Sequence, residues 1–130
     1  ELRAPTVFLC VAFTARGACV TGTAHGELML WETGSLVRVV RAHAGAVHAL
    51  CVHGDTVLSA GRAAKLGFWS AELDVVGAID LRAALDGLQD EFGRPVSAST
   101  SALSVRALAT DGERIFVGTR AGEVLQLPTS

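Results

Sequence analysis

The chain alternates short apolar runs with clusters of polar and turn-forming residues. Residues 7–13 and 18–21 are apolar runs separated by a turn sequence, and His25-Gly26 marks a second tight turn. The next run ends at Trp31, and a fourth run occupies residues 36–40. Runs of this length with turn residues between them predict four short strands in one antiparallel sheet.

The same order of strands returns twice. Further strands are predicted at 46–52, 56–59, 66–69, 75–79, 105–109, 114–118 and 123–127. The third strand of the second set ends at Trp69, which follows Trp31 by 38 positions, and Leu127 stands at that place in the third set. Four-stranded repeats of about 40–45 residues whose third strand ends on tryptophan are typical of WD40 blades. We therefore predict an all-β fold of WD40 β-propeller blades, two complete four-stranded antiparallel blades and a partial third.

One segment interrupts the repeats. Leu81, Leu85, Leu88 and Phe92 follow helical spacing and predict a short amphipathic helix at 81–92, ahead of a Ser-rich loop. The sequence then predicts the following units: a blade at 1–41, a blade at 42–80, the helical and Ser-rich insertion at 81–104, and a partial blade at 105–130. Because closed propellers typically have 4–8 blades, we expect the whole chain to be a fragment of a larger propeller.

Composition narrows the class of protein. Half of the 130 residues are hydrophobic, and the net charge is −2 with no Lys/Arg run. This balance favours a globular core and argues against nucleic acid as a partner. No apolar stretch approaches the roughly 20 residues that would span a membrane. The three cysteines form no Cys-x-x-Cys pair and predict reduced core thiols in a cytoplasmic protein.

Several phrases resemble the echinoderm microtubule-associated protein-like (EMAP-like) family of WD40 proteins. Residues 8–13, 20–23 and 26–31 are similar to one blade of that family, and residues 41–51 are similar to the junction that follows it. The phrases at 58–69, 105–109 and 116–126 are similar to later family phrases, in the same order. The chain departs from the family in the turn Arg62–Lys65 and in a longer link between Gly93 and Val105.

The resemblance implies a scaffold associated with tubulin or microtubules, with cytoplasmic, cytoskeletal localisation. WD40 blades commonly contain a His that bonds a Ser or Thr and a Trp of the same blade. The residues at these places are His43, Ser59 and Trp69, with Trp31 as the tryptophan of the first blade. We expect this set to be a structural network that satisfies buried polar groups.

No set of residues predicts catalysis, a cofactor or a metal. The candidate bases are His25, His43, His48 and His53, and none has a nucleophile or carboxylate at a recognisable spacing. His48 and Cys51 do not match a zinc pattern, and no phosphate-binding glycine motif occurs. We therefore predict a protein that is not an enzyme.

Binding residues are expected on the loops, because propeller blades are rigid and their loops vary. The exposed candidates are His25, Arg62, Lys65 and Arg120. The positive charges of Arg62, Lys65 and Arg120 would suit the acidic surface of tubulin. The leading hypothesis is a non-enzymatic WD40 scaffold segment of a microtubule-associated protein, which also contacts the remaining blades of its own chain. The alternative is a generic WD40 adaptor for complexes unrelated to microtubules.

Overall fold

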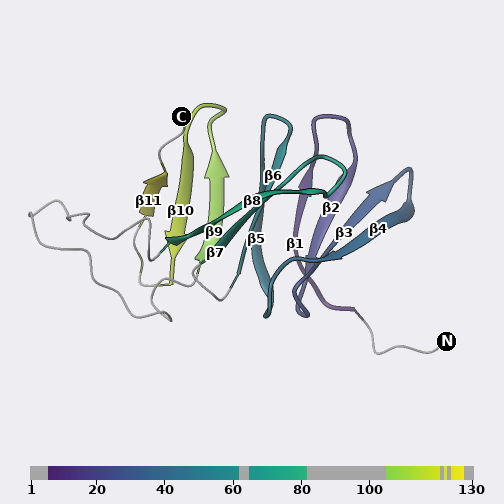
Figure 1. Ribbon diagram of the computed structural model, residues 1–130, viewed down its shortest axis with the longest axis horizontal. Coiled ribbons are helices and arrows are strands. Elements are labelled where there is room, and N and C mark those ends of the chain that lie inside the picture. The colour runs from purple at the N-terminus through teal and green to yellow at the C-terminus, as the bar shows by residue number, and fades with distance from the viewer. Residues whose placement is uncertain (1–5, 62–64, 82–104, 121, 123, 128–130) are drawn as a thin grey trace, which may run out of the picture.

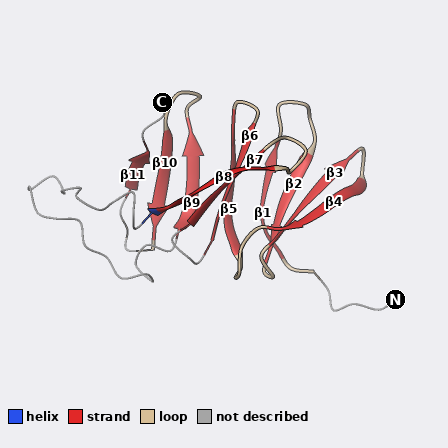
Figure 2. Cartoon of the chain, in the orientation of Figure 1, coloured by secondary structure: helices blue, strands red, loops and turns tan. Residues whose placement is uncertain are grey.

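The structure is a computed structural model that describes residues 6–61, 65–81, 105–120, 122 and 124–127. Across these residues the chain forms strands joined by turns (Figures 1 and 2). The strands are β1 (Phe8–Phe13), β2 (Cys19–Thr23), β3 (Glu27–Glu32), β4 (Ser35–Arg41), β5 (Val47–His53), β6 (Thr56–Gly61), β7 (Lys65–Trp69), β8 (Val75–Asp80), β9 (Val105–Thr110), β10 (Ile115–Thr119) and β11 (Val124–Leu127).

The strands form three antiparallel sheets, and each sheet keeps its strands in chain order. The first sheet has the order β1-β2-β3-β4 and the second β5-β6-β7-β8, while the third joins β9, β10 and β11. Tight turns make this meander possible. Gly26, between β2 and β3, has a φ of 86°, a value that glycine adopts at no steric cost.

Side chains close other turns. In the β9–β10 turn, Asp111 Oδ1 accepts hydrogen bonds from the backbone N–H of Glu113 at 2.9 Å and of Arg114 at 2.7 Å. These bonds stabilise the carboxylate and lower the pKa of Asp111 to about 2, and the bond from the Arg114 N–H has the largest effect. The turn between β9 and β10 is therefore stabilised by its own aspartate.

The three sheets stand side by side and contact one another through their first strands (Figure 1). β1 contacts β5, and β5 contacts β9, although about 40 to 60 residues separate each pair in the chain. One apolar cluster, which includes Val20, Leu28, Leu50 and Trp69, fills the space between the first two sheets. A second cluster lies between the second and third sheets and includes Leu58, Leu66, Val105 and Val117.

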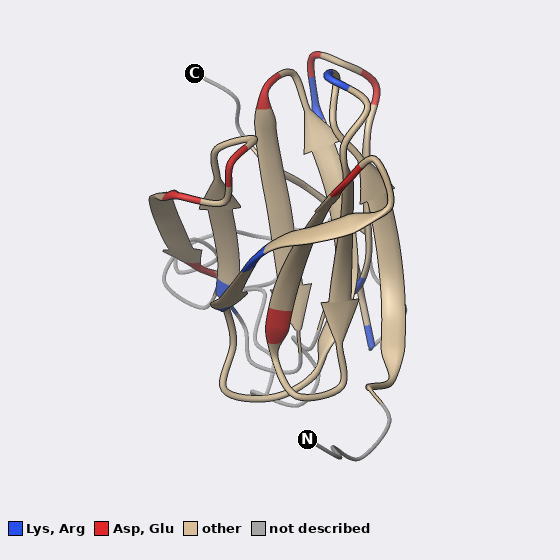
Figure 3. Ribbon diagram, turned by 90° about the vertical axis from the view of Figure 1, so that its right-hand side faces the viewer, with Lys and Arg blue, Asp and Glu red and all other residues tan. Residues whose placement is uncertain are grey.

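The outer face of the first sheet is apolar and exposed. Val11 and Phe13 of β1 are 56% and 66% exposed, and Val39 of β4 is 43% exposed. β1 carries no charged residue, whereas charged residues occur mainly at turns and strand ends (Figure 3). Burying such side chains is favourable by about 1.5–3 kcal/mol each. The face is therefore suited to contact with another apolar surface.

Some sequence predictions fall where the structure gives no description. The helix predicted at 81–92 and the rest of the insertion to residue 104 lie outside the described residues, except for Leu81, which is fully buried in the second cluster. Among the described residues there is no helix of the length and apolarity that a bilayer crossing requires.

Candidate functional site

A polar network connects the junction between the first two sheets with the interior of the second. Ser59 on β6 is fully buried, and its Oγ lies 2.9 Å from His43 Nε2 and 2.9 Å from Trp69 Nε1. The indole N–H donates to the hydroxyl, so the hydroxyl hydrogen can be donated to an unprotonated Nε2. The structure thus brings together His43, Ser59 and Trp69, three of the four residues assigned to the network from the sequence.

Backbone contacts hold this network in place. The Gly26 carbonyl accepts hydrogen bonds from the N–H of Ala42 at 2.8 Å and of His43 at 3.0 Å, which ties the junction to the first sheet. Gly67 lies beneath the Ser59–Trp69 bond, where a Cβ would fall 2.7 Å from Trp69 Nε1 and 2.8 Å from Ser59 Oγ. Glycine is required there because a methyl group would collide with both hydrogen-bonding atoms.

The environment favours a neutral His43. Burial of the imidazole lowers the pKa of His43 from 6.5, hydrogen bonding at Ser59 opposes this shift, and the positive charge of Lys65 adds to it. Among the described residues no carboxylate joins this network, and the printed partner of the His43 ring, Ser59, is itself bonded to Trp69. Its geometry therefore matches the stabilising role expected from the sequence better than that of a general base.

Trp31, the fourth network residue, has a separate partner. Its Nε1 donates to Thr21 Oγ1 at 3.0 Å, and the Phe8 ring meets the indole edge-on at a centroid distance of 6.2 Å. Ten residues separate Trp31 from Thr21, and ten also separate Trp69 from Ser59. The two tryptophans therefore occupy equivalent places in successive sheets, although Trp69 is covered by the first sheet and Trp31 is only half-buried.

Polar contacts between sheets were not found from the sequence. Arg38 on β4 donates to Asp74 Oδ1 at 2.7 Å, and Arg16 forms an ion pair with Glu72 at 2.7 Å. His53 Nδ1 lies 2.6 Å from Thr110 Oγ1 and joins the second sheet to the third. No local sequence signal marks these pairs, because their members lie 36 to 57 residues apart.

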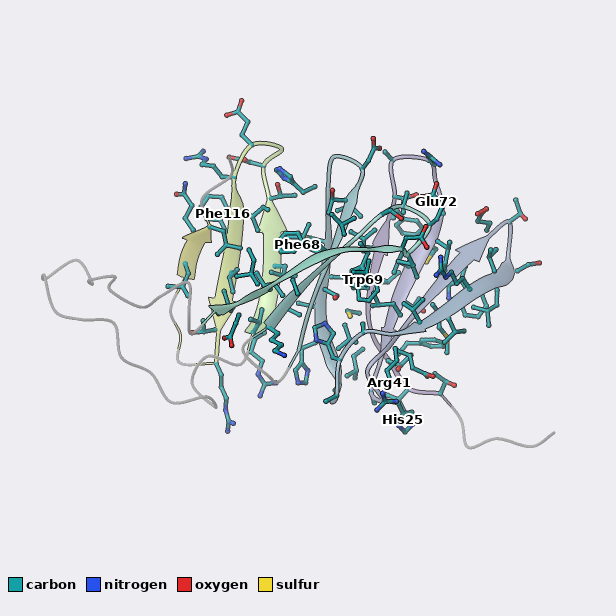
Figure 4. All side chains as sticks on the ribbon, viewed as in Figure 1. His25, Arg41, Phe68, Trp69, Glu72 and Phe116 are labelled. Atoms are coloured by element: carbon teal, nitrogen blue, oxygen red, sulfur yellow. The ribbon has the colours of Figure 1, made fainter. Side chains whose placement is uncertain are left out.

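The structure separates the candidate binding residues. His25 is exposed in the β2–β3 turn beside the junction, Lys65 is exposed at the start of β7, and Arg120 is exposed after β10 on the third sheet. Arg62 lies outside the described residues. Figure 4 shows His25 with Arg41 at one end of the strands. The described candidates lie on three different sheets, so a partner that contacts all of them must span more than one sheet.

The cysteines lie in packed surroundings. Burial raises the pKa of Cys10 and of Cys51 to about 11, and Cys10 Sγ donates to the Val47 carbonyl at 3.4 Å. A thiol of this pKa is a poor nucleophile at neutral pH. All three cysteines are free thiols. Within the described ranges, no three His, Cys, Asp or Glu side chains gather closely enough to hold a metal ion.

The arrangement of sheets is found in solved propellers. The β-propeller domain of Myceliophteria_thermophila Cps50 (Swd1) matches 96% of this chain and 36% of its own, with a TM-score of 0.64 and 16% identity. A chain of the Mitotic Checkpoint Complex matches 98% of this chain and 35% of its own, with a TM-score of 0.69 and 14% identity. The fold is that of WD40 β-propeller blades, with two complete four-stranded blades and a partial third among the described residues.

Sequence comparison gives the family resemblance. The chain is 29% identical over 127 residues to echinoderm microtubule-associated protein-like 2 of Rattus norvegicus, and 28% identical over 128 residues to the human EMAP-like 1. A stretch of 73 residues is 34% identical to the 77 kDa echinoderm microtubule-associated protein of Lytechinus variegatus. No family model matches the sequence.

The EMAP-like resemblance predicted from the sequence is therefore confirmed, at modest identity. The matches to EMAP-like 2 and EMAP-like 1 cover 93% and 94% of this chain. The chain spans only 17% and 14% of the length of those two relatives.

Proposed function

We propose that the chain is a non-enzymatic WD40 scaffold segment of a microtubule-associated protein and contributes to binding tubulin, microtubules or another cytoskeletal protein. The observation that supports this most directly is similarity to EMAP-like proteins over 93% of the chain. Their names associate those relatives with microtubules. The proposal places the protein in the cytoplasm on the microtubule cytoskeleton, with no nucleic acid, membrane or cofactor in its function.

We also propose that the first sheet contacts a further blade of the propeller. We assign one blade each to residues 1–41 and 42–80, an insertion to 81–104 and a partial blade to 105–130. The apolar outer face of the first sheet supports contact with a further blade, since Val11 and Phe13 are 56% and 66% exposed. The equivalent face of the second sheet, which carries Trp69, is covered by the first sheet.

Basic residues at the ends of strands and in turns are the proposed binding charges. An acidic partner is proposed to contact the basic residues Arg62, Lys65 and Arg120. His25 is proposed to belong to the same binding surface. Lys65 and Arg120 support this assignment because both are exposed, and neither is ion-paired with a described residue. Exposed charges of this kind chiefly increase the association rate, and salt weakens their effect.

Co-sedimentation of the full-length protein with microtubules tests this function. We expect the wild type to pellet with microtubules and the triple variant R62E/K65E/R120E to pellet less, most clearly at low salt. The control R16E/R106E/R114E changes the net charge equally at other exposed arginines, and far-UV circular dichroism checks that losing the Arg16–Glu72 and Arg114–Asp111 ion pairs leaves it folded. No pelleting by the wild type would remove the microtubule function. Equal pelleting by the two variants would remove the assignment of charges.

The alternative, a generic WD40 adaptor, differs in its partner and not in its fold. It would be favoured if the wild type failed to pellet with microtubules but recovered a defined complex from cell extract.

A further inference from the structure

A pocket of about 500 Å³ opens where the chain passes from the first sheet to the second. The junction residues 41–44 form one side, and β7 and β8 form the other. Its volume falls within the roughly 300–1,000 Å³ of typical ligand sites. We call it the rim pocket.

The floor of the rim pocket is apolar. The lining includes two cross-strand pairs of β7 and β8, Gly67 with Ala78 and Trp69 with Val75. The small side chains of Gly67 and Ala78 leave the space open. The indole of Trp69 is 7% exposed and stays bonded to Ser59, so this wall is rigid. A preformed apolar surface of this kind accepts an aliphatic side chain without rearrangement.

The rim of the pocket is positively charged. Arg41 of the junction and Lys65 of β7 are exposed and line the pocket from its two sides, and half-buried His43 lies on the junction side. No carboxylate is among the lining residues, and no ion pair joins either cation to another described residue. Asp80 stands opposite Lys65 in the strand register but does not line the pocket. Since the chain as a whole has a net charge of −2, this positive rim is a local feature.

We propose that the rim pocket binds an acidic peptide segment of a partner protein, with an aliphatic side chain on the Trp69 floor and flanking carboxylates against Arg41 and Lys65. Figure 4 shows Arg41 at the end of the strands and Trp69 farther inside. Charge complementarity selects the acidic backbone, and the apolar floor selects the inserted side chain. The site goes beyond the scaffold function, because it would bind such a peptide whether or not microtubules are the partner.

The test uses the full-length protein and a short fluorescein-labelled peptide with glutamates around a central Leu-Leu pair. Two control peptides replace the leucines by serine or the glutamates by glutamine. Fluorescence anisotropy should give the probe peptide at least about tenfold tighter binding than either control, with affinity falling as salt rises. Equal affinity for the three peptides would overturn the proposal.

Matched variants locate the binding. Ala78→Leu fills the pocket without changing charge, and Val76→Leu adds the same kind of bulk on an exposed β8 residue outside it. We expect A78L to weaken peptide binding about tenfold or more and V76L to leave it unchanged. K65E and R41E should each weaken binding, whereas R106E should not, since exposed Arg106 lies outside the lining. Far-UV circular dichroism checks that each variant is folded.

Other outcomes are also decisive. Identical affinities for A78L and V76L, or binding to phosphatidylserine vesicles in place of the peptide, would overturn the rim pocket as a peptide site. Peptide binding without microtubule pelleting would remove the proposed function and retain the rim pocket. If A78L left microtubule pelleting unchanged and the peptide did not bind, the rim pocket would be disproved as a peptide site and the proposed function would be retained.

Discussion

Trp69 Nε1 donates a hydrogen bond of 2.9 Å to Ser59 Oγ, ten residues earlier in the chain. Trp31 and Thr21 repeat this relationship in the first blade at 3.0 Å, again ten residues apart. In the third blade the corresponding residues are Leu127 and Val117, both buried and apolar. Positions ten residues apart therefore form a hydrogen-bonded pair in the first two blades and an apolar pair in the third.

Removal of the central hydroxyl should destabilise the second blade. Ser59→Ala leaves the Trp69 indole N–H and His43 Nε2 without their buried partner, which should lower the free energy of unfolding by about 1–3 kcal/mol. Thr21→Val is the matched control. It should cost less, because half-buried Trp31 can bond to water instead. Urea denaturation of the full-length protein measures both, and equal losses would argue against a special role for Ser59.

A single methyl group at Gly67 should be harmful. Its Cβ would lie 2.7 Å from Trp69 Nε1 and 2.8 Å from Ser59 Oγ, so Gly67→Ala should destabilise the protein by about 1–3 kcal/mol through overpacking. Gly77→Ala on the neighbouring strand meets nothing within 4 Å and should be neutral or slightly stabilising. The difference between the two denaturation midpoints is the measurement. A neutral G67A would show that the network is not tightly packed.

Stability should fall in mild acid because of His43. Its native pKa is lowered from 6.5, chiefly by burial, so the unfolded chain binds the proton more readily than the native one. The stabilisation is complete above about pH 6.5 and is lost as the pH falls below that value toward the native pKa. Denaturation midpoints between pH 8 and pH 5 should drop more steeply in the wild type than in His43→Gln. Parallel curves would contradict this assignment.

The Cys51 thiol should resist alkylation in the native protein. It is buried, and its pKa of about 11 is two units above the usual 9.0, which leaves about a hundredfold less thiolate at neutral pH. Peptide mass spectrometry after iodoacetamide treatment should show slow labelling of Cys51 in native protein and rapid labelling in urea. Equal labelling in both would mean that the second blade opens readily.

The outer face of the first blade should behave as an interior surface in the full-length protein. Phe13→Lys or Val11→Lys would then bury an unpaired charge and cost about 2 kcal/mol or more. Val76→Lys, at 65% exposure on an outer strand, should stay within about 0.5 kcal/mol of the wild type. If all three variants were neutral, the face would be open to solvent and the contact with a further blade would be disproved.

The sequence by itself determined the local elements. Short apolar runs, turn residues and the 38-residue step from Trp31 to Trp69 are properties of neighbouring positions, so they predicted the strands, their antiparallel order and the WD40 class. The residues His43, Ser59 and Trp69 were also named in advance, because family resemblance fixes their places within one repeat.

The tertiary structure decided the relations between repeats. The local pattern does not predict that β1 packs beside β5 and β5 beside β9, because strand spacing does not specify how one sheet faces the next. It also does not predict the contact of His53 with Thr110. The same holds for the rim pocket, which needs Arg41 of one blade and Lys65 of another. Only the stacking of blades places these residues together, because burial of apolar faces fixes the angle and distance between successive sheets.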